Sequence, residues 1–243
     1  TPALSSAASD VYKRQTYGTA EHADYRMVDI ETGRASVTFT IRHDGAEVTR
    51  VELPTPGMHN ARNAAAAFVA TIAAGGSAAA AAAALARFGG VARRFEFRGE
   101  IDGVTFVDDY AHLPTEVEAA LAAAADGGWE RIVCVFQPHR YSRTAALWQD
   151  FADGFVGADV LVVTDIYASG ETPRPGITGK LIVDAVLDTH PWSTVAWMPR
   201  LDDAAGWLAH RLRPGDLCLT LGAGDLTGLP DQVIGRLEHR GAA

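Results

Sequence analysis

Three side chains that can carry positive charge lie within five residues of one another in the segment QPHRYSR (137–143). They are His139, Arg140 and Arg143. The two arginines are three residues apart, so on one helical turn they can face the same way. Two guanidinium groups placed like this bind a carboxylate or a phosphate through forked hydrogen bonds. The segment therefore predicts an anion site, and the alternative is a solvated surface turn.

A second group of reactive residue types is DDYAH (108–112). Asp108, Asp109 and His112 could ligate a metal, but His112 is the segment's one strong nitrogen donor, and this disfavours a metal site. In a structural interpretation, Asp109 or Thr115 would cap the helix that Pro114 helps to begin. That interpretation accounts for one of these side chains and leaves the others for a polar site.

Two further segments have weaker signals. Asn60 and Asn63 are spaced so that their amides could meet the edge of a base, although residues of this type more often cap a helix. The segment GAGD (222–225) resembles part of a dinucleotide fingerprint, but Gly228 comes one place too late for it. We predict a tight turn there. The chain also contains no GxxxxGK[ST] phosphate-binding loop.

Apolar strands and intervening helices must position the polar segments. Continuous apolar runs, which are typical of a parallel sheet covered on both faces, predict strands at 103–107, 131–136, 158–164, 194–198 and 216–221. We expect helices at 114–125, 145–155, 180–187, 201–212 and 232–238, joined by right-handed crossovers. The pattern predicts a doubly wound, three-layer α/β domain from about residue 92 to the end.

The polar segments follow the predicted strands directly. They are 108–112, 137–143, 165–171 and 222–225. In an open α/β sheet the ligand crevice lies at the carboxyl ends of the strands. The four segments are therefore predicted to form one site.

The sequence before Gly89–Gly90 has a different character. Period-two alternation at 36–41 and 47–53, around Asp44–Gly45, predicts an antiparallel hairpin. The alanine-rich stretch 63–88 predicts two helices broken at Gly75–Gly76, with Ser77 as the N-cap of the second. We therefore expect an α+β part here, and leave residues 1–15 unassigned.

Composition limits the classes of function. The chain has 243 residues, 48% hydrophobic and 21% charged, with a net charge of −9. It is thus typical of a globular protein without a basic surface for nucleic acid or anionic membranes. Cys134 and Cys218 lie in apolar runs and are expected to be buried, reduced thiols of a cytoplasmic protein. We find no signal peptide and no stretch typical of a membrane span.

Five segments taken in order resemble a known family. GMHNARNAAAA (57–67), RRFEFRGE (93–100), VDDYAHLPTEV (107–117), FQPHRYSRT (136–144) and LTLGAGD (219–225) resemble the second half of the Mur ligases, over residue 16 to the end. The resemblance implies the C-terminal portion of a central ATP-binding domain at 16–91, and a Rossmann-like C-terminal amino-acid-binding domain at 92–243. It makes residues 89–93 a candidate hinge. The family's UDP-binding domain and P-loop would precede this region.

The resemblance also implies a role for individual residues. Asn60 and Asn63 would bind adenine with His59 beside them, Asp109 would hold the ribose, and Arg94 would approach the nucleotide. The residues that would orient the incoming amino acid are Tyr110, His139, Arg140 and Arg143. His112 would lie near the transferred phosphate, so His112, Arg140 and Arg143 are the candidate catalytic residues. Leu113 stands where many relatives have a second histidine, which weakens any role that needs paired histidines.

The implied reaction is ATP-dependent amide formation in peptidoglycan precursor synthesis. The carboxylate of UDP-N-acetylmuramate would be phosphorylated to an acyl phosphate, which the amine of L-alanine would attack while the arginines stabilise the anionic groups. QPHRYSRT favours the alanine-adding branch. ATP and Mg²⁺ are implied, with the magnesium ligands mostly in the preceding half, so this chain is expected to be inactive alone. The alternatives are a sibling ligase with a different 137–143 segment, and a non-catalytic module that binds an amino acid or a nucleotide.

Overall fold

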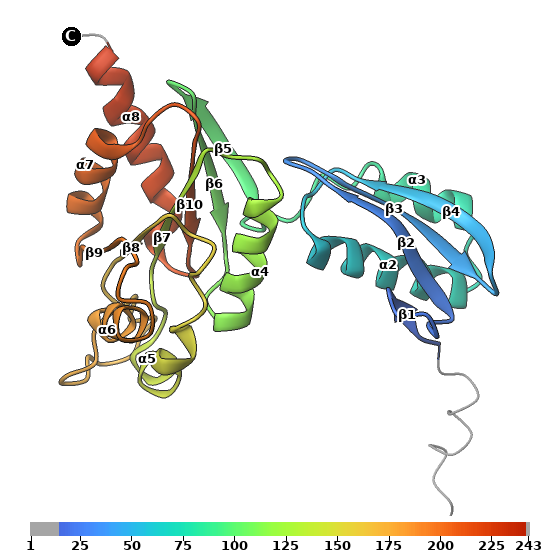
Figure 1. Cartoon of the computed structure of the whole chain (residues 1–243), viewed down its shortest axis with the longest axis horizontal. Coiled ribbons are helices and arrows are strands. Elements are labelled where there is room, and N and C mark those ends of the chain that lie inside the picture. The colour runs from blue at the N-terminus through green and yellow to red at the C-terminus, as the bar shows by residue number, and fades with distance from the viewer. Residues whose placement is uncertain (1–14, 242–243) are drawn as a thin grey trace, which may run out of the picture. The chain divides into compact units, whose positions relative to one another are not determined.

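The computed structural model describes residues 15–241, so the unassigned segment 1–15 lies outside the described residues except for Gln15. The chain divides into two compact units between Gly89 and Gly90, where the sequence changes character. Unit 1 is the part before this boundary and unit 2 is the part after it (Figure 1). No helix of the described part is long and apolar enough to cross a membrane.

Unit 1 contains a sheet of strands in sequence order. The strands are β1 (Tyr17–Gly18), β2 (Tyr25–Thr32), β3 (Val37–His43) and β4 (Ala46–Leu53). β3 and β4 form the predicted antiparallel hairpin, and Asp44 and Gly45 adopt positive φ values of 50° and 77° in its turn. β2 pairs antiparallel with β3 and was not predicted. Its second half, from Asp29, is mostly exposed and polar, which hides the alternation.

The two predicted helices of unit 1 pack on this sheet. They are α2 (Met58–Ala73) and α3 (Ala78–Leu85). Ser77 caps α3, because its hydroxyl accepts a hydrogen bond from Ala80 N at 3.4 Å. Phe68 of α2 and Phe39 and Ile41 of β3 are fully buried in the shared core.

Unit 2 is built on a mixed sheet in which the order of strands is β5-β6-β10-β7-β8-β9 within residues 90–241. The strands are β5 (Glu96–Ile101), β6 (Val104–Asp109), β7 (Arg131–Phe136), β8 (Val160–Val163), β9 (Val195–Trp197) and β10 (Asp216–Leu221). All neighbours pair in parallel except β5, which pairs antiparallel with β6. The predicted mainly parallel, doubly wound domain is confirmed.

Helices cover both faces of this sheet (Figure 1). One face packs against α4 (Pro114–Ala125), the short helix η2 (Trp148–Phe151) and α6 (Lys180–Thr189). The other face packs against α7 (Leu201–Arg211) and α8 (Leu229–Gly241). The chain runs outward from β6 to β9 with helices on the first face, then returns to β10 through α7 on the second face. Reversing direction and face together keeps the handedness of the crossovers the same.

Some boundaries in unit 2 differ from the prediction. The helix expected at 145–155 begins earlier, as α5 (Tyr141–Leu147), and continues into η2. The short helix η3 (Asp225–Gly228) precedes α8, which is longer than predicted. Cys134 and Cys218 are buried free thiols, as predicted. They lie in the two different core clusters, and burial raises the pKa of both.

Candidate functional site

The four polar loops of unit 2 meet at the carboxyl ends of the parallel strands, as predicted. The loop after β7 contacts the loop after β8 through a hydrogen bond from Arg140 N to Tyr167 O, 2.9 Å long. The same loop contacts the one after β10, because Gln137 Nε2 donates to Asp225 Oδ1 at 2.7 Å. β10 lies between β6 and β7, and the helix that follows it, α8, covers the opposite face from α4 and η2, which follow β6 and β7, so this edge is the topological switch point of the sheet.

A chain of aromatic rings connects three of these loops. His112 lies edge-on to Tyr110 with ring centroids 5.4 Å apart, and 5.7 Å from the ring of His139. His139 in turn stacks on Tyr167 at 5.6 Å. The structure therefore brings together three residues that the sequence selected and a fourth, Tyr167, that it did not.

Arg143 contacts His139 within the basic segment. Arg143 Nη1 lies 3.0 Å from Nδ1 of His139, and because a guanidinium only donates, this nitrogen must accept. Burial lowers the pKa of His139, and the nearby charges of Arg143, His112 and Arg140 lower it further. We therefore assign His139 as the neutral tautomer with its proton on Nε2, where it can donate to a ligand.

Arg140 and Arg143 lie at the start of α5. Arg140 is the N-cap residue, is exposed and has a φ of 72°, a left-handed conformation that is unusual for a residue other than glycine. The side chain of Arg140 makes no capping hydrogen bond to this helix. The carboxylate of Glu171 instead accepts hydrogen bonds from Ser142 N, at 2.8 Å, and from the Ser142 hydroxyl. These bonds lower the pKa of Glu171.

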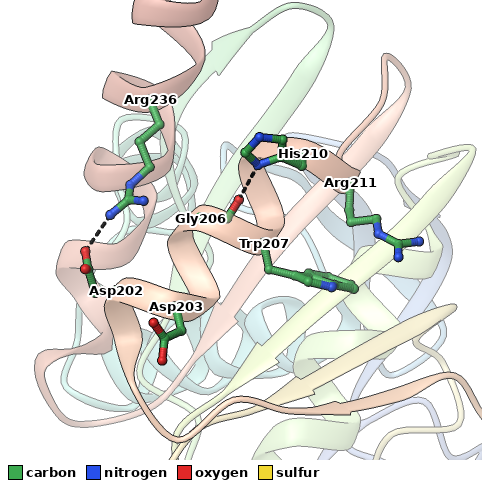
Figure 2. A pocket seen from close by; sticks show the side chains of 7 residues that line it. All are labelled: Asp202, Asp203, Gly206, Trp207, His210, Arg211 and Arg236. Atoms are coloured by element: carbon green, nitrogen blue, oxygen red, sulfur yellow. Dashed lines mark hydrogen bonds and ion pairs between the residues drawn. The ribbon is translucent and has the colours of Figure 1, made fainter.

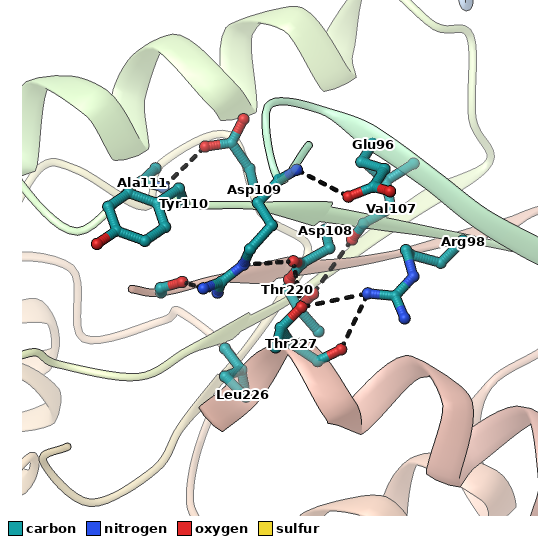
Figure 3. A network of polar contacts seen from close by, with 12 residues as sticks. Glu96, Arg98, Val107, Asp108, Asp109, Tyr110, Ala111, Thr220, Leu226 and Thr227 are labelled. Atoms are coloured by element: carbon teal, nitrogen blue, oxygen red, sulfur yellow. Dashed lines mark hydrogen bonds and ion pairs between the residues drawn. The ribbon is translucent and has the colours of Figure 1, made fainter. Parts of the chain in front are cut away.

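A buried polar network lies beneath the first loop (Figure 3). The fully buried carboxylate of Asp108 accepts hydrogen bonds from Thr220 Oγ1 at 2.6 Å, Thr227 Oγ1 at 2.8 Å and Arg93 Nε at 3.1 Å. Arg93 also donates to the carbonyl of Gly222. Asp108 therefore joins β6, β10 and the start of unit 2 rather than facing a ligand.

Asp109 has a different structural role from the one predicted. Its carboxylate accepts hydrogen bonds from Phe95 N at 2.8 Å and Ala111 N at 2.7 Å, and burial raises its pKa. The expectation that Asp109 or Thr115 caps α4 is wrong. Leu113 is the N-cap residue, and Glu116 accepts hydrogen bonds from the N–H groups of Leu113 and His112 at 3.2 and 3.0 Å. The glutamate is favoured because it sits in the first turn, near the positive end of the helix dipole.

The acidic residues of this edge do not form a cluster of metal ligands. The carboxylates of Asp108 and Asp109 are both bound by groups of the chain itself. Within residues 15–241, no three His, Cys, Asp or Glu side chains are placed to hold a metal ion. We assign no metal ligand to this chain.

The residues expected to contact adenine belong to unit 1. His59 and Asn60 are half-buried and Asn63 is exposed, all in the first two turns of α2. The side chain of Asn60 donates to Pro56 O at 2.8 Å, which ties the helix to the preceding loop, whereas the N-cap position is Gly57 with φ 95°. Arg94 belongs to unit 2, and its guanidinium lies 5.7 Å from the centre of the Tyr110 ring.

Several site residues were missed by sequence reasoning. Tyr167 and Glu171 were placed in the third loop without a role, and Arg93 was not separated from Arg94. The positive φ of Arg93, 59°, and its contact with Asp108 depend on the folded sheet and leave no local signal. For Glu171 the available signal was its position in a polar segment directly after a predicted strand.

A hollow of about 480 Å³ lies away from these loops, on α7 and α8 (Figure 2). Asp202 pairs with Arg236 across it, and His210 Nδ1 contacts the carbonyl of Gly206 at 2.8 Å. Its lining consists of Asp202, Asp203, Gly206, Trp207, His210, Arg211 and Arg236, none of which lies in the four loops. We assign no ligand to it.

Comparisons with known proteins identify one family. The profile described as "Mur ligase, glutamate ligase domain" matches residues 93–224, more than half of the chain. The chain is 46% identical over 93% of its length to UDP-N-acetylmuramate–L-alanine ligase of Kineococcus radiotolerans, covering 47% of that protein. It is 44% identical over 98% of its length to the ligase of the same name from an Anaeromyxobacter species, covering 52% of it. The chain thus spans about half the length of the curated relatives it matches.

Solved structures agree with this assignment. UDP-N-acetylmuramate-alanine ligase from Thermotoga maritima matches 93% of the chain and 48% of its own, with a TM-score of 0.78 and 27% identity. A MurF ligase from Thermotoga maritima, solved in complex with ADP, shares the fold over 92% of this chain and 49% of its own, with a TM-score of 0.65 and 18% identity. The chain therefore belongs to the Mur ligase family.

Proposed function

We propose that the protein containing this chain ligates L-alanine to UDP-N-acetylmuramate in the cytoplasm, at the expense of ATP. A carboxylate oxygen of the muramate attacks the γ-phosphorus and ADP leaves. The alanine nitrogen then attacks the acyl carbon, phosphate leaves with the bonding electrons, and the nitrogen loses a proton to give the amide. One observation carries the proposal: the chain is 46% identical to a ligase of this name over 93% of its length. The aligned part includes the basic loop at the sheet edge.

We assign the binding of the incoming amino acid to Tyr110, His139, Arg140 and Arg143. Their clustering at the switch point supports a carboxylate site, because an exposed Arg140 guanidinium and the Nε2–H of His139 both donate. We place His112 near the transferred phosphate. Its Nδ1 lies 2.9 Å from Tyr110 O, a contact that requires a proton on Nδ1, so Nε2 can donate to phosphate when the ring is protonated.

We assign the binding of adenine to Asn60 and Asn63, with His59 beside them, and the binding of the ribose to Asp109. The amide of Asn63 is exposed, which supports a contact with a base edge. Each oxygen of Asp109 already accepts one backbone hydrogen bond and keeps a second lone pair for a ribose hydroxyl. Arg94 would approach the nucleotide. Mg²⁺ would accompany ATP and neutralise phosphate charge, and no described residue is assigned to it.

Joining this chain to the N-terminal half of the Kineococcus radiotolerans ligase tests the proposal. We call this the joined protein. We expect L-alanine-dependent release of phosphate with UDP-N-acetylmuramate and ATP from the joined protein, and none from the chain alone, because positioning of phosphate and magnesium supplies most of the catalysis in phosphoryl transfer.

A well-folded joined protein that releases no phosphate with L-alanine would contradict the proposal. Alanine-dependent turnover by the chain alone would contradict the expectation that the preceding half is needed, since the chain carries no P-loop sequence. If the joined protein prefers another amino acid, the sibling-ligase interpretation replaces this one.

A further inference from the structure

Glu171 connects the third loop to the helix that carries the basic residues. It lies in the loop after β8, whereas its two hydrogen-bond donors, the amide and the hydroxyl of Ser142, lie in the first turn of α5. Ser142 stands between Arg140 and Arg143 in sequence. The carboxylate therefore holds the turn that carries both guanidinium groups, from 29 residues away.

We propose that Glu171 is a positioning residue for the amino-acid site: its carboxylate caps α5 and so fixes Arg140 and Arg143 in the geometry that binds the carboxylate of the incoming amino acid. This inference rests on the proposed function. Glu171 touches neither substrate nor the reacting atoms in this scheme.

The helix needs an external cap. The first N–H groups of a helix have no partner within it, and the N-cap residue of α5, Arg140, supplies no side-chain acceptor. Arg140 also holds a left-handed φ of 72°, a conformation that persists in such a residue only where the surroundings enforce it. The enforcing contacts are Arg140 N to Tyr167 O at 2.9 Å and the two bonds to Glu171, all from the third loop.

The third loop is itself anchored, so Glu171 is presented from a fixed position. Asp165 Oδ1 accepts hydrogen bonds from Ile166 N at 2.9 Å and from Gly179 N, at the start of α6, at 3.2 Å. Tyr167 N donates to Pro138 O at 2.9 Å, which continues the β7–β8 pairing beyond the strands. Ser169 and Gly170 then adopt positive φ values of 50° and 83°, and this turn precedes Glu171.

The contacts of Glu171 favour capping over an ion pair. Within the described residues its carboxylate makes no salt bridge, although the charges of Arg174 and Arg140 are near enough to lower its pKa slightly. The larger causes of the lowered pKa are the two bonds from Ser142, which select the ionised form. A charged acceptor at the first turn also interacts favourably with the helix dipole.

Steady-state kinetics of Glu171→Gln in the joined protein test the proposal. The amide can accept one of the two hydrogen bonds but has no charge, so the arginine pair loses its alignment. We expect the KM for L-alanine to rise about tenfold, the size of one charge-assisted hydrogen bond, with kcat and the KM for ATP within about twofold. Glu171→Asp should give a smaller rise, because it retains the charge on a shorter side chain. The matched control is Glu118→Gln, an exposed carboxylate on α4, which should change none of these constants.

Amide hydrogen exchange in the 243-residue chain provides a second readout that does not depend on activity. Glu171→Gln should speed exchange at the backbone amide of residue 142 by about tenfold or more. Ser142→Ala should speed it less, because this variant retains the backbone bond to the carboxylate. Glu118→Gln should change it least.

The outcomes separate this inference from the proposed function. A wild-type joined protein without alanine-dependent activity overturns the proposed function, and unchanged exchange at Ser142 in Glu171→Gln overturns the cap. An active protein in which Glu171→Gln leaves the KM for L-alanine unchanged, or lowers kcat and raises both KM values alike, overturns the positioning role. A selective rise in the KM for L-alanine together with faster exchange at Ser142 supports it.

Discussion

His139 and Arg143 form the most unusual pair in the candidate site, because a histidine normally avoids an arginine unless it stays neutral. The 3.0 Å contact uses the lone pair of His139 Nδ1, and protonation of that nitrogen would place two cations against each other. Arg143 thus selects the tautomer of its neighbour, and burial together with the charge of Arg143 keeps the ring neutral. The site then presents one N–H from His139 without adding a charge that varies near neutral pH.

We predict that Arg143→Gln raises the pKa of His139 in this chain. Burial is the larger cause of the lowered pKa, so the value should move toward the ordinary 6.5 without reaching it. NMR titration of the histidine ring measures this directly. Arg174→Gln is a suitable control, because Arg174 is an exposed arginine of the same region whose charge acts on Glu171. An unchanged or lower pKa of His139 in Arg143→Gln would show that the contact does not exist in solution.

The same pKa determines how His139 affects stability with pH. Because the folded pKa lies below the unfolded value near 6.5, the unfolded state binds a proton first as the pH falls. The contribution of His139 to the free energy of unfolding is therefore present above pH of about 6.5 and is lost progressively below it, down to the lowered folded pKa. Arg143→Gln should reduce this loss.

The loop between β10 and η3 comes close to two neighbouring loops at Gly224, the loop after β7 and the loop after β8. A Cβ atom built there would overlap Gln137 Oε1 and the ring of Tyr167. The backbone of Gly224 has a negative φ of −100°, so space rather than conformation requires glycine at this position. The tyrosine that stacks on His139 is thus also in close contact with this loop.

We predict that Gly224→Ala destabilises unit 2 by about 1–3 kcal/mol, the cost of overpacking a closed site. Chemical denaturation followed by circular dichroism gives the free energy of unfolding. Gly228→Ala is the matched control, since its added Cβ would meet only Gln232 Nε2 at 3.9 Å and should stay within about 0.5 kcal/mol of wild type. Equal effects of the two substitutions would contradict the packing described for Tyr167.

The sequence predicted elements whose signal is local and missed those that depend on distant partners. The five parallel strands lie in continuous apolar runs, so they could be predicted directly, and β7 and β10 are indeed buried on both faces. β5 was missed because its residues, EFRGEI, are mostly polar and half-exposed at the edge of the sheet. The start of α5 was placed too late because its cap, Glu171, comes from another loop and cannot be found in the neighbouring sequence.

The same distinction between local and distant signals applies to the candidate site. The loops could be grouped in advance, because parallel strands place their carboxyl ends at one edge whatever the side chains are. The capping of α4 was wrongly predicted, since Asp109 is drawn to the backbone of Phe95 and Ala111 once the sheet forms. The acceptor used instead, Glu116, lies in the first turn of α4 itself, so this capping could have been predicted from the local sequence.

The segment that connects the two units is shorter than the candidate hinge at residues 89–93. Arg93 O accepts a hydrogen bond from Tyr110 N at 2.7 Å, and the guanidinium of Arg93 lies 5.0 Å from the centre of the Tyr110 ring. Together with the buried pair formed with Asp108, these contacts make Arg93 part of unit 2. Any hinge between the units is therefore expected within residues 89–92, where Gly90 has a φ of 83°.

We infer that the switch point of unit 2 binds the carboxylate of the incoming amino acid through its arginine pair. The kinetics of Arg143→Lys in the joined protein test this most directly, because lysine retains the charge and loses the planar fork. We expect kcat/KM for L-alanine to fall by about ten- to a hundredfold, or roughly 1.5 to 3 kcal/mol, while the KM for ATP stays within about twofold. An unaltered kcat/KM for L-alanine, or an equal loss for both substrates, would contradict it.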